Sequence, residues 1–101
     1  MITNREIPAA IADLKTFKAN NVTGQSFPDA GGLHVPSASG RLNYDEAEKF
    51  YANRLRMTYV VHSYETPIAW VLDDGAVHLV DQTFSPTTSR HQRLVRRGFG
   101  A

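Results

Sequence analysis

The chain has 101 residues, no cysteine and a formal net charge of +1. This length suits one domain with one modest core, and the lack of cysteine excludes disulfide bonds and thiolate metal sites. No stretch approaches the roughly 20 apolar residues that a membrane helix requires, and the N-terminal residues lack the pattern of a signal peptide. The sequence therefore predicts a single soluble domain, 1–101, in the cytoplasm and not in a membrane.

The charge is distributed unevenly along the chain. Residues 1–84 carry seven basic and ten acidic side chains, a balance of −3, whereas residues 85–101 carry four arginines and no acid, a balance of +4. A basic segment of this kind indicates an anionic partner or self-association, so a homodimer is one of the alternatives. A helix C-terminus that complements its own dipole gives the same pattern.

Apolar residues at helical spacing predict a first helix over 8–19. Pro8 suits its first position, because a proline lacks the N–H that would be unsatisfied there. An alternative start is a capping box between Thr3 and Glu6, but it would place Pro8 inside the helix, where an N–H is needed. The apolar positions are Ile7, Ala10, Ile11, Leu14 and Phe17.

The segment 20–41 has no regular period, because glycine, proline and small polar residues interrupt it. It is long for a structureless loop, so it is either a functional loop or an irregular hairpin with short strands near 22–27 and 33–35. After it, Asn43 is predicted to cap a helix over 44–55, with Glu46 as its capping-box partner.

Residues 57–83 are rich in β-branched and aromatic side chains, which favour strands. Asp-Gly at 74–75 lies between two apolar runs and is a strong hairpin signal, and Pro67 belongs at the start of a strand because it cannot donate a ladder hydrogen bond. A three-stranded antiparallel meander is predicted, with strands over 57–64, 68–72 and 76–83.

Ser85 and Pro86 begin a last helix, over 86–97, as N-cap and first helical residue. On a helical wheel, His91 lies at the centre of the apolar side, and arginines occupy the other side. The predicted fold is thus α+β: two N-terminal helices, a three-stranded antiparallel meander and a C-terminal amphipathic basic helix, with the helices on one face of the sheet.

Structural roles are expected for several side chains of the C-terminal half. His91 should point inward and bond Thr87, a strand group or a backbone carbonyl, because buried polar groups need partners. Thr87 and Thr88 serve the start of the last helix, and Trp70 belongs to the core. No catalytic residue is predicted.

The outer side of the last helix has two interpretations. Its charges are either solvated, as is usual near a helix C-terminus, or they bind phosphates through forked guanidiniums. Nucleic acid is the first partner that the second interpretation indicates. The residues concerned are Arg90, Arg93, Arg96 and Arg97.

Histidine and aromatic residues suggest two further kinds of site. His62, His78 and His91 could converge on the sheet as a metal site or an acid–base group, but their spacing matches no metal signature, so no metal or cofactor is predicted. The second kind of site is a platform of aromatic side chains on which bases stack, although aromatic residues in a small sheet more often form core and cross-strand pairs. The aromatic candidates are Tyr59, Tyr64 and Trp70.

Two stretches, SYETPIAW at 63–70 and TTSRHQ at 87–92, resemble a signature of small proteins from actinobacterial phages and related bacteria. The resemblance covers the C-terminal half, and Glu65 stands where that signature has a small residue. Those proteins share a domain of unknown function. The resemblance therefore implies a phage-type origin in a bacterial host cell and assigns no catalytic residue.

Three hypotheses for the function follow. The first is a non-catalytic module that binds nucleic acid through the arginines of the last helix. The second is a protein-interaction factor that inhibits or redirects a host component, through the aromatic strands or the 20–41 segment. The third is a small toxin-like endoribonuclease that uses His62, His78 or His91, and an inward His91 argues against it.

Overall fold

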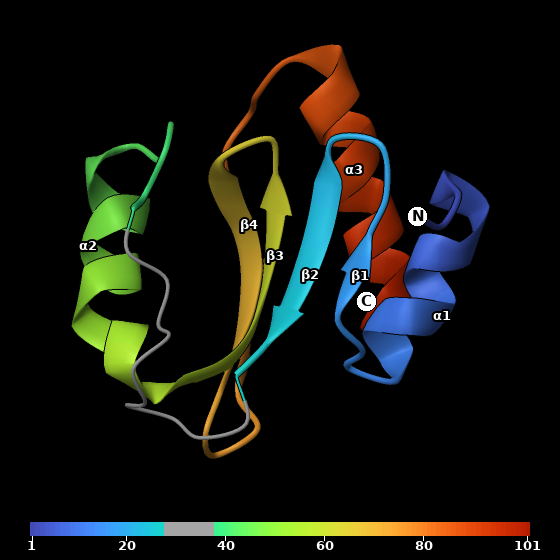
Figure 1. Cartoon of the computed structure of the whole chain (residues 1–101). Helices are drawn as coiled ribbons and strands as arrows, with labels where there is room; N and C mark the ends of the chain where they lie inside the picture. Colours follow the sequence, from blue (N-terminus) through green and yellow to red (C-terminus); the bar gives the residue numbers. More distant parts are fainter. Residues whose placement is uncertain (28–37) are drawn as a thin grey trace.

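The computed structural model describes residues 1–27 and 38–101. Within them, five strands form one antiparallel sheet in the order β1-β2-β3-β4-β5, so each strand pairs with its neighbours in sequence (Figure 1). The helices are α1 (Ile7–Ala12), α2 (Tyr44–Asn53) and α3 (Pro86–Gly98). The strands are β1 (Phe17–Lys18), β2 (Val22–Ser26), β3 (Met57–Ser63), β4 (Thr66–Leu72) and β5 (Val77–Leu79).

The sheet lies between two layers of helix, α2 on one face and α1 with α3 on the other (Figure 1). Each face has its own hydrophobic core. The larger core joins α1 and α3 to the sheet and includes Ile11 and Val95. The smaller core joins α2 to the sheet and includes Phe50, Val60 and Trp70.

The predicted fold, two N-terminal helices with a three-stranded meander and a C-terminal helix on one face, is wrong in two respects. The sheet has two further strands, β1 and β2, and α2 covers the opposite face from α1 and α3. Both faces need cover because β3 and β4 are buried at nearly every position, and not at alternate ones. Such continuous burial is typical of strands that lie between two layers.

The predicted helix over 8–19 is wrong at its C-terminal end, because α1 stops after Ala12. Leu14 adopts a φ of 52°, and its N–H and that of Lys15 donate to carbonyls of the last turn of α1, at 2.9 Å each. These two bonds form a Schellman motif, in which glycine usually occupies the position of Leu14. The chain turns here, and Phe17 enters β1 instead of another helical turn.

The helical start also differs from the prediction. A 3-10 turn over Asn4–Glu6 precedes α1, and the Glu6 carboxylate accepts hydrogen bonds from the N–H (3.2 Å) and the hydroxyl (3.0 Å) of Thr3. The N–H of Ile7 donates to the carbonyl of Asn4 in this tight turn. Pro8 follows directly at the start of α1, where its missing N–H leaves no hydrogen bond unmade. The capping box and the proline are therefore compatible in one helix start.

β2 is the strand predicted near 22–27 as one alternative for the irregular segment, and it pairs with β3 along its whole length. Gly24 permits a close approach within this part of the sheet. A Cβ at Gly24 would collide with the Phe17 ring and the Tyr59 hydroxyl. The other predicted strand, near 33–35, lies outside the described residues.

The other two helices begin where the sequence predicts. The side chains of Asn43 and Ser85 accept hydrogen bonds from backbone N–H groups in the first turns of α2 and α3, at 2.9 and 3.3 Å. α3 ends at Gly98, where an added Cβ would lie 2.7 Å from Ile11, so glycine lets α1 and α3 pack closely. Among the described residues, no helix has the length and apolar character needed to cross a membrane.

Candidate functional site

The two sides of α3 have different surroundings. Thr88, His91 and Val95 are buried on the side that packs against the sheet and α1. Successive helical residues are rotated by about 100°, so the arginines fall within an arc of about 120° on the opposite side, and all of them are exposed. Together they form the arginine face, which consists of Arg90, Arg93, Arg96 and Arg97.

In residues 1–27 and 38–101, no guanidinium of the arginine face forms an ion pair with a carboxylate. Arg56 shows the contrasting arrangement, because it contacts the carboxylates of both Asp73 and Asp74 at 3.1 Å. Arg56 is thus engaged within the protein. The donors of the arginine face point to solvent without such partners among the described acids.

A shallow groove of about 250 Å³ runs between α3 and the segment that follows β5. Gln92 holds this segment against the helix, since its Nε2 donates to the carbonyls of Val80 and Gln82 at 3.1 Å each. Arg93 and Arg96 line one wall, and Asp81 is an acidic member of the other. The arginine face therefore has a concave border as well as an open surface.

His91 belongs to a buried chain of hydrogen bonds between α3 and β3. Its Nδ1 lies 2.7 Å from the hydroxyl of Ser63, which lies 3.1 Å from that of Thr88. Burial and, secondly, the charge of Arg90 lower the pKa of His91. A neutral imidazole can accept a hydrogen bond from the Ser63 hydroxyl at Nδ1, and Ser63 can in turn accept one from the Thr88 hydroxyl.

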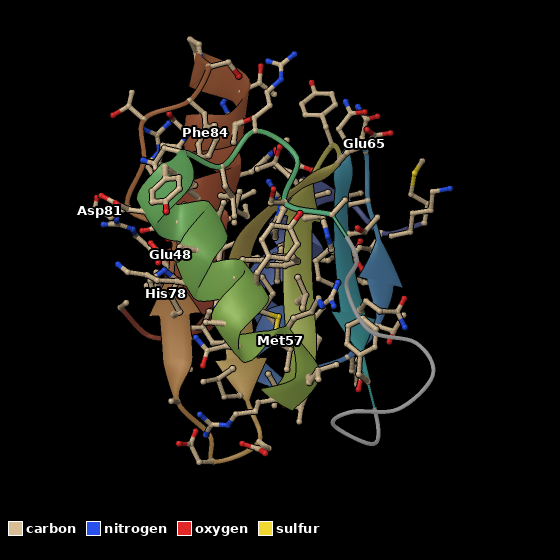
Figure 2. All side chains as sticks on the ribbon, turned by 90° about the vertical axis from the view of Figure 1, so that its left-hand side faces the viewer. Glu48, Met57, Glu65, His78, Asp81 and Phe84 are labelled. Carbon is tan, nitrogen blue, oxygen red and sulfur yellow. The ribbon has the colours of Figure 1, made fainter. Side chains whose placement is uncertain are left out.

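A pocket of about 600 Å³ opens where the turn between β3 and β4 meets the segment before α2 and the start of α3. The N–H of Arg41 donates to the Thr66 hydroxyl at 2.9 Å, and Gln82 Nε2 donates to the Arg41 carbonyl at 3.0 Å, which fixes that wall. Figure 2 shows Glu65 at this turn, at the end of the sheet where α3 begins. The lining includes Arg41, Ser63, Tyr64, Glu65, Thr66 and Thr88.

The three aromatic candidates differ sharply in exposure. Tyr59 and Trp70 are 1% exposed, and the Tyr59 hydroxyl donates to the carbonyl of Lys15 at 2.7 Å. Both are core residues. Tyr64 is 54% exposed beside the pocket, and its backbone adopts a φ of 55°.

The opposite face of the sheet holds a second polar contact. The Glu46 side chain was predicted to return to its N-cap, but Glu46 is buried and its carboxylate lies 2.7 Å from Nε2 of His78. His78 also stacks on Trp70, with ring centroids 4.6 Å apart. Figure 2 shows His78 on the sheet beside α2. Glu46 therefore joins α2 to the sheet and does not complete a capping box.

The three histidines do not converge. His78 lies on the α2 face, and alternation along β3 places His62 on that face as well, with Val60. His91 lies on the other face, with the sheet between them. The described residues contain no group of three or more potential metal ligands.

Burial of His62 and His91 predicts a loss of stability in mild acid. Burial lowers the pKa of both imidazoles below the ordinary value of about 6.5. Below that pH the unfolded chain binds protons that the folded chain does not, so the free energy of unfolding decreases as the pH falls. Urea unfolding at about pH 7.5 and about pH 5.5 measures the effect. Equal stability at both values, or imidazole NMR titrations with midpoints above 6.5, would contradict it.

Sequence patterns do not point to two residues of this region, because Ser63 as the partner of His91 and Arg41 as a pocket wall carry no local motif. Tyr64 was one of the three aromatic candidates, but no local pattern marks it as the exposed one. One signal was available: the stretches at 63–70 and 87–92 contribute most of the pocket and of the hydrogen-bonded chain behind it. The spatial meeting of these two stretches was not predicted.

Comparison with known proteins gives one match. A family model described as "Family of unknown function (DUF8033)" matches residues 39–101. No curated protein and no solved structure matches the chain. The matched residues contain the arginine face, the pocket and α2, whereas α1, β1 and β2 precede them.

Proposed function

Because the chain belongs to the DUF8033 family, whose function is unknown, we propose a function from its surface: a module that binds nucleic acid through the arginine face. The observation that carries this proposal is the set of four exposed guanidiniums on one side of α3, none of them in an ion pair with a described acid. The phage-type origin and the bacterial cytoplasm that the resemblance implies belong to the same proposal.

The chemistry of guanidinium supports a phosphate partner. Its planar fork donates two parallel hydrogen bonds to a phosphate or carboxylate and stays charged at every physiological pH. Attraction to the helix dipole explains cations only in the last turn of a helix, which contains Arg96 and Arg97. Arg90 and Arg93 lie before that turn, so the dipole alone does not account for the whole arginine face.

The ribonuclease hypothesis has little support in the geometry. His91 is buried and engaged with Ser63, and His62 and His78 lie across the sheet from it. A general base must come within hydrogen-bond reach of the group that it deprotonates. His91 therefore shares no accessible surface with either of the other two histidines, and His78 is engaged with Glu46.

A second candidate function, binding of a host protein, is favoured by the outer side of α2. Tyr44, Tyr51 and Leu55 are exposed there, along α2 and the 3-10 turn that follows it. Large exposed apolar side chains that cluster often mark a protein interface. Capture of one defined host protein that is lost when Tyr44 and Tyr51 are both changed to serine would support this candidate.

The leading proposal is tested by fluorescence anisotropy with labelled single-stranded DNA, duplex DNA and RNA. Four phosphate contacts give a log–log salt slope of about −0.9 per phosphate on duplex and about −0.7 on single strands, so binding should weaken about 50-fold to 150-fold between about 50 and 200 mM salt. Absence of binding to all three at the lower salt concentration would refute the proposal.

A further inference from the structure

We propose that Tyr64 and the adjoining pocket receive an unstacked base, so that the nucleic acid recognised by this protein is single-stranded. The inference rests on the proposed function and names its substrate class. Phosphates would lie on the arginine face, and one base would leave the strand to stack on the Tyr64 ring beside the pocket. Base–aromatic stacking of this kind is the usual way in which proteins hold single strands.

The placement of Tyr64 is the first observation. The turn between β3 and β4 holds it with a φ of 55°, a conformation that tyrosine rarely adopts, and its N–H donates to the Asn21 carbonyl at 2.7 Å. Tyr64 is 54% exposed in this turn, while Tyr59 and Trp70 are buried. Residues in sparsely populated backbone conformations cluster at binding and active sites, and Tyr64 lines the pocket.

The lining of the pocket is the second observation. Its volume of about 600 Å³ lies within the range of small-molecule sites, about 300–1,000 Å³. The Thr66 hydroxyl accepts from the Arg41 N–H, and its own proton can be donated to an acceptor on a base edge. The Glu65 carboxylate can accept from the amino group of a base and would repel a phosphate. The pocket therefore suits a base better than a phosphate.

The connection between the pocket and the arginine face is the third observation. The Tyr64 ring lies 6.2 Å from the His91 ring, centroid to centroid, and His91 follows Arg90 in α3. Successive residues of a helix are rotated by about 100°, so Arg90 is the edge of the arginine face nearest to His91, and the helix rises by about 10 Å from there to Arg97. The four guanidiniums form a track that starts at this edge. A strand lying along this track has a base within reach of Tyr64, whereas a duplex would first have to unstack a base at a cost of a few kcal/mol.

The test compares two substitutions at Tyr64. Tyr64→Asn removes the ring and keeps a residue that tolerates positive φ, and Tyr64→Phe keeps the ring. For a short single strand, Tyr64→Asn should weaken binding about 5-fold to 150-fold, the effect of losing one base–aromatic stack, and Tyr64→Phe should bind as the wild type does. Duplex affinity should be the same for all three proteins. Tyr44→Asn, which removes an exposed tyrosine on α2, is the matched control and should change nothing.

The outcomes separate the two proposals. Equal single-strand affinity of the wild type and Tyr64→Asn, with binding still dependent on the arginine face, overturns the base pocket and leaves the proposed function intact. If no oligonucleotide binds, the proposed function fails, and the pocket is tested directly with ethenoadenosine monophosphate. Fluorescence quenching of this nucleotide by the wild type and not by Tyr64→Asn would then support the pocket, and no quenching by either would overturn it.

Discussion

Changing both Arg93 and Arg96 to glutamate is expected to weaken binding of a single-stranded oligonucleotide about a hundredfold or more at low salt. A hydrogen bond to a charged group is worth about 1.5–3 kcal/mol, so two lost guanidinium contacts cost about 3 kcal/mol or more, and each 1.4 kcal/mol is about a factor of ten. The new carboxylates add repulsion. Anisotropy titration at about 50 mM salt measures the change.

Lys49 provides the matched control for this experiment. It lies on α2, across the sheet from the arginine face, and its side chain is 57% exposed. Lys49→Glu changes the net charge as much as Arg93→Glu does, so a loss of affinity caused by overall charge would appear in both. We expect a loss only for Arg93→Glu. Equal losses of affinity for the two single substitutions would contradict binding by the arginine face.

Trp70→Ala is expected to destabilise the protein by about 3–5 kcal/mol. Trp70 is 1% exposed and lies at the centre of the α2 face of the sheet, with its ring edge-on to Phe50 at 5.6 Å and stacked on His78. The substitution leaves a cavity between α2 and the sheet. Since domains are stable by only about 5–15 kcal/mol, the substitution should remove a large part of the free energy of unfolding.

Thermal unfolding followed by circular dichroism measures this effect, because Trp70 is the single tryptophan and its fluorescence is lost in the variant. A drop in Tm of about 15 °C or more is expected. Val77→Ala on β5 is the control, since Val77 is 46% exposed and should cost less than about 0.5 kcal/mol. A Tm of Trp70→Ala close to that of Val77→Ala would contradict the packing described for α2.

The elements that the sequence predicted well carry local signals. Asn43 and Ser85 cap their helices through their own side chains, and the Asp-Gly turn at 74–75 joins β4 to β5. Each signal lies within a few residues of the structure that it specifies. The division of α3 into a buried side and an arginine face could be obtained in the same way, because helical geometry alone determines it.

The parts that were predicted wrongly depend on contacts distant in sequence or on unusual residues. The turn that ends α1 has Leu14 in a left-handed backbone conformation. Glycine is the usual residue at this position, and a glycine there would have predicted the turn. β1 and β2 are short, and β2 includes Gly24, so they become strands only by pairing with each other and with β3. The position of α2 on the second face could have been inferred from the continuous apolar runs of β3 and β4.

The candidate site was predictable only in part for the same reason. The arginine face lies on one helix, whereas the pocket combines three segments that meet only in the folded chain. Arg41 contacts Thr66 across 25 residues, and Ser63 contacts His91 across 28. The sequence could therefore predict that His91 needs a hydrogen-bond partner, but only the structure identifies that partner as Ser63.

Phosphate binding by the arginine face is tested by the salt dependence of single-strand affinity, measured for the wild type and for a variant with both Arg93 and Arg96 changed to glutamine. Four phosphate contacts predict a slope of log affinity against log salt of about −2.8 for the wild type and about −1.4 for the variant. A wild-type slope near zero, or a slope that the two substitutions leave unchanged, would contradict the assignment of phosphate binding to the arginine face.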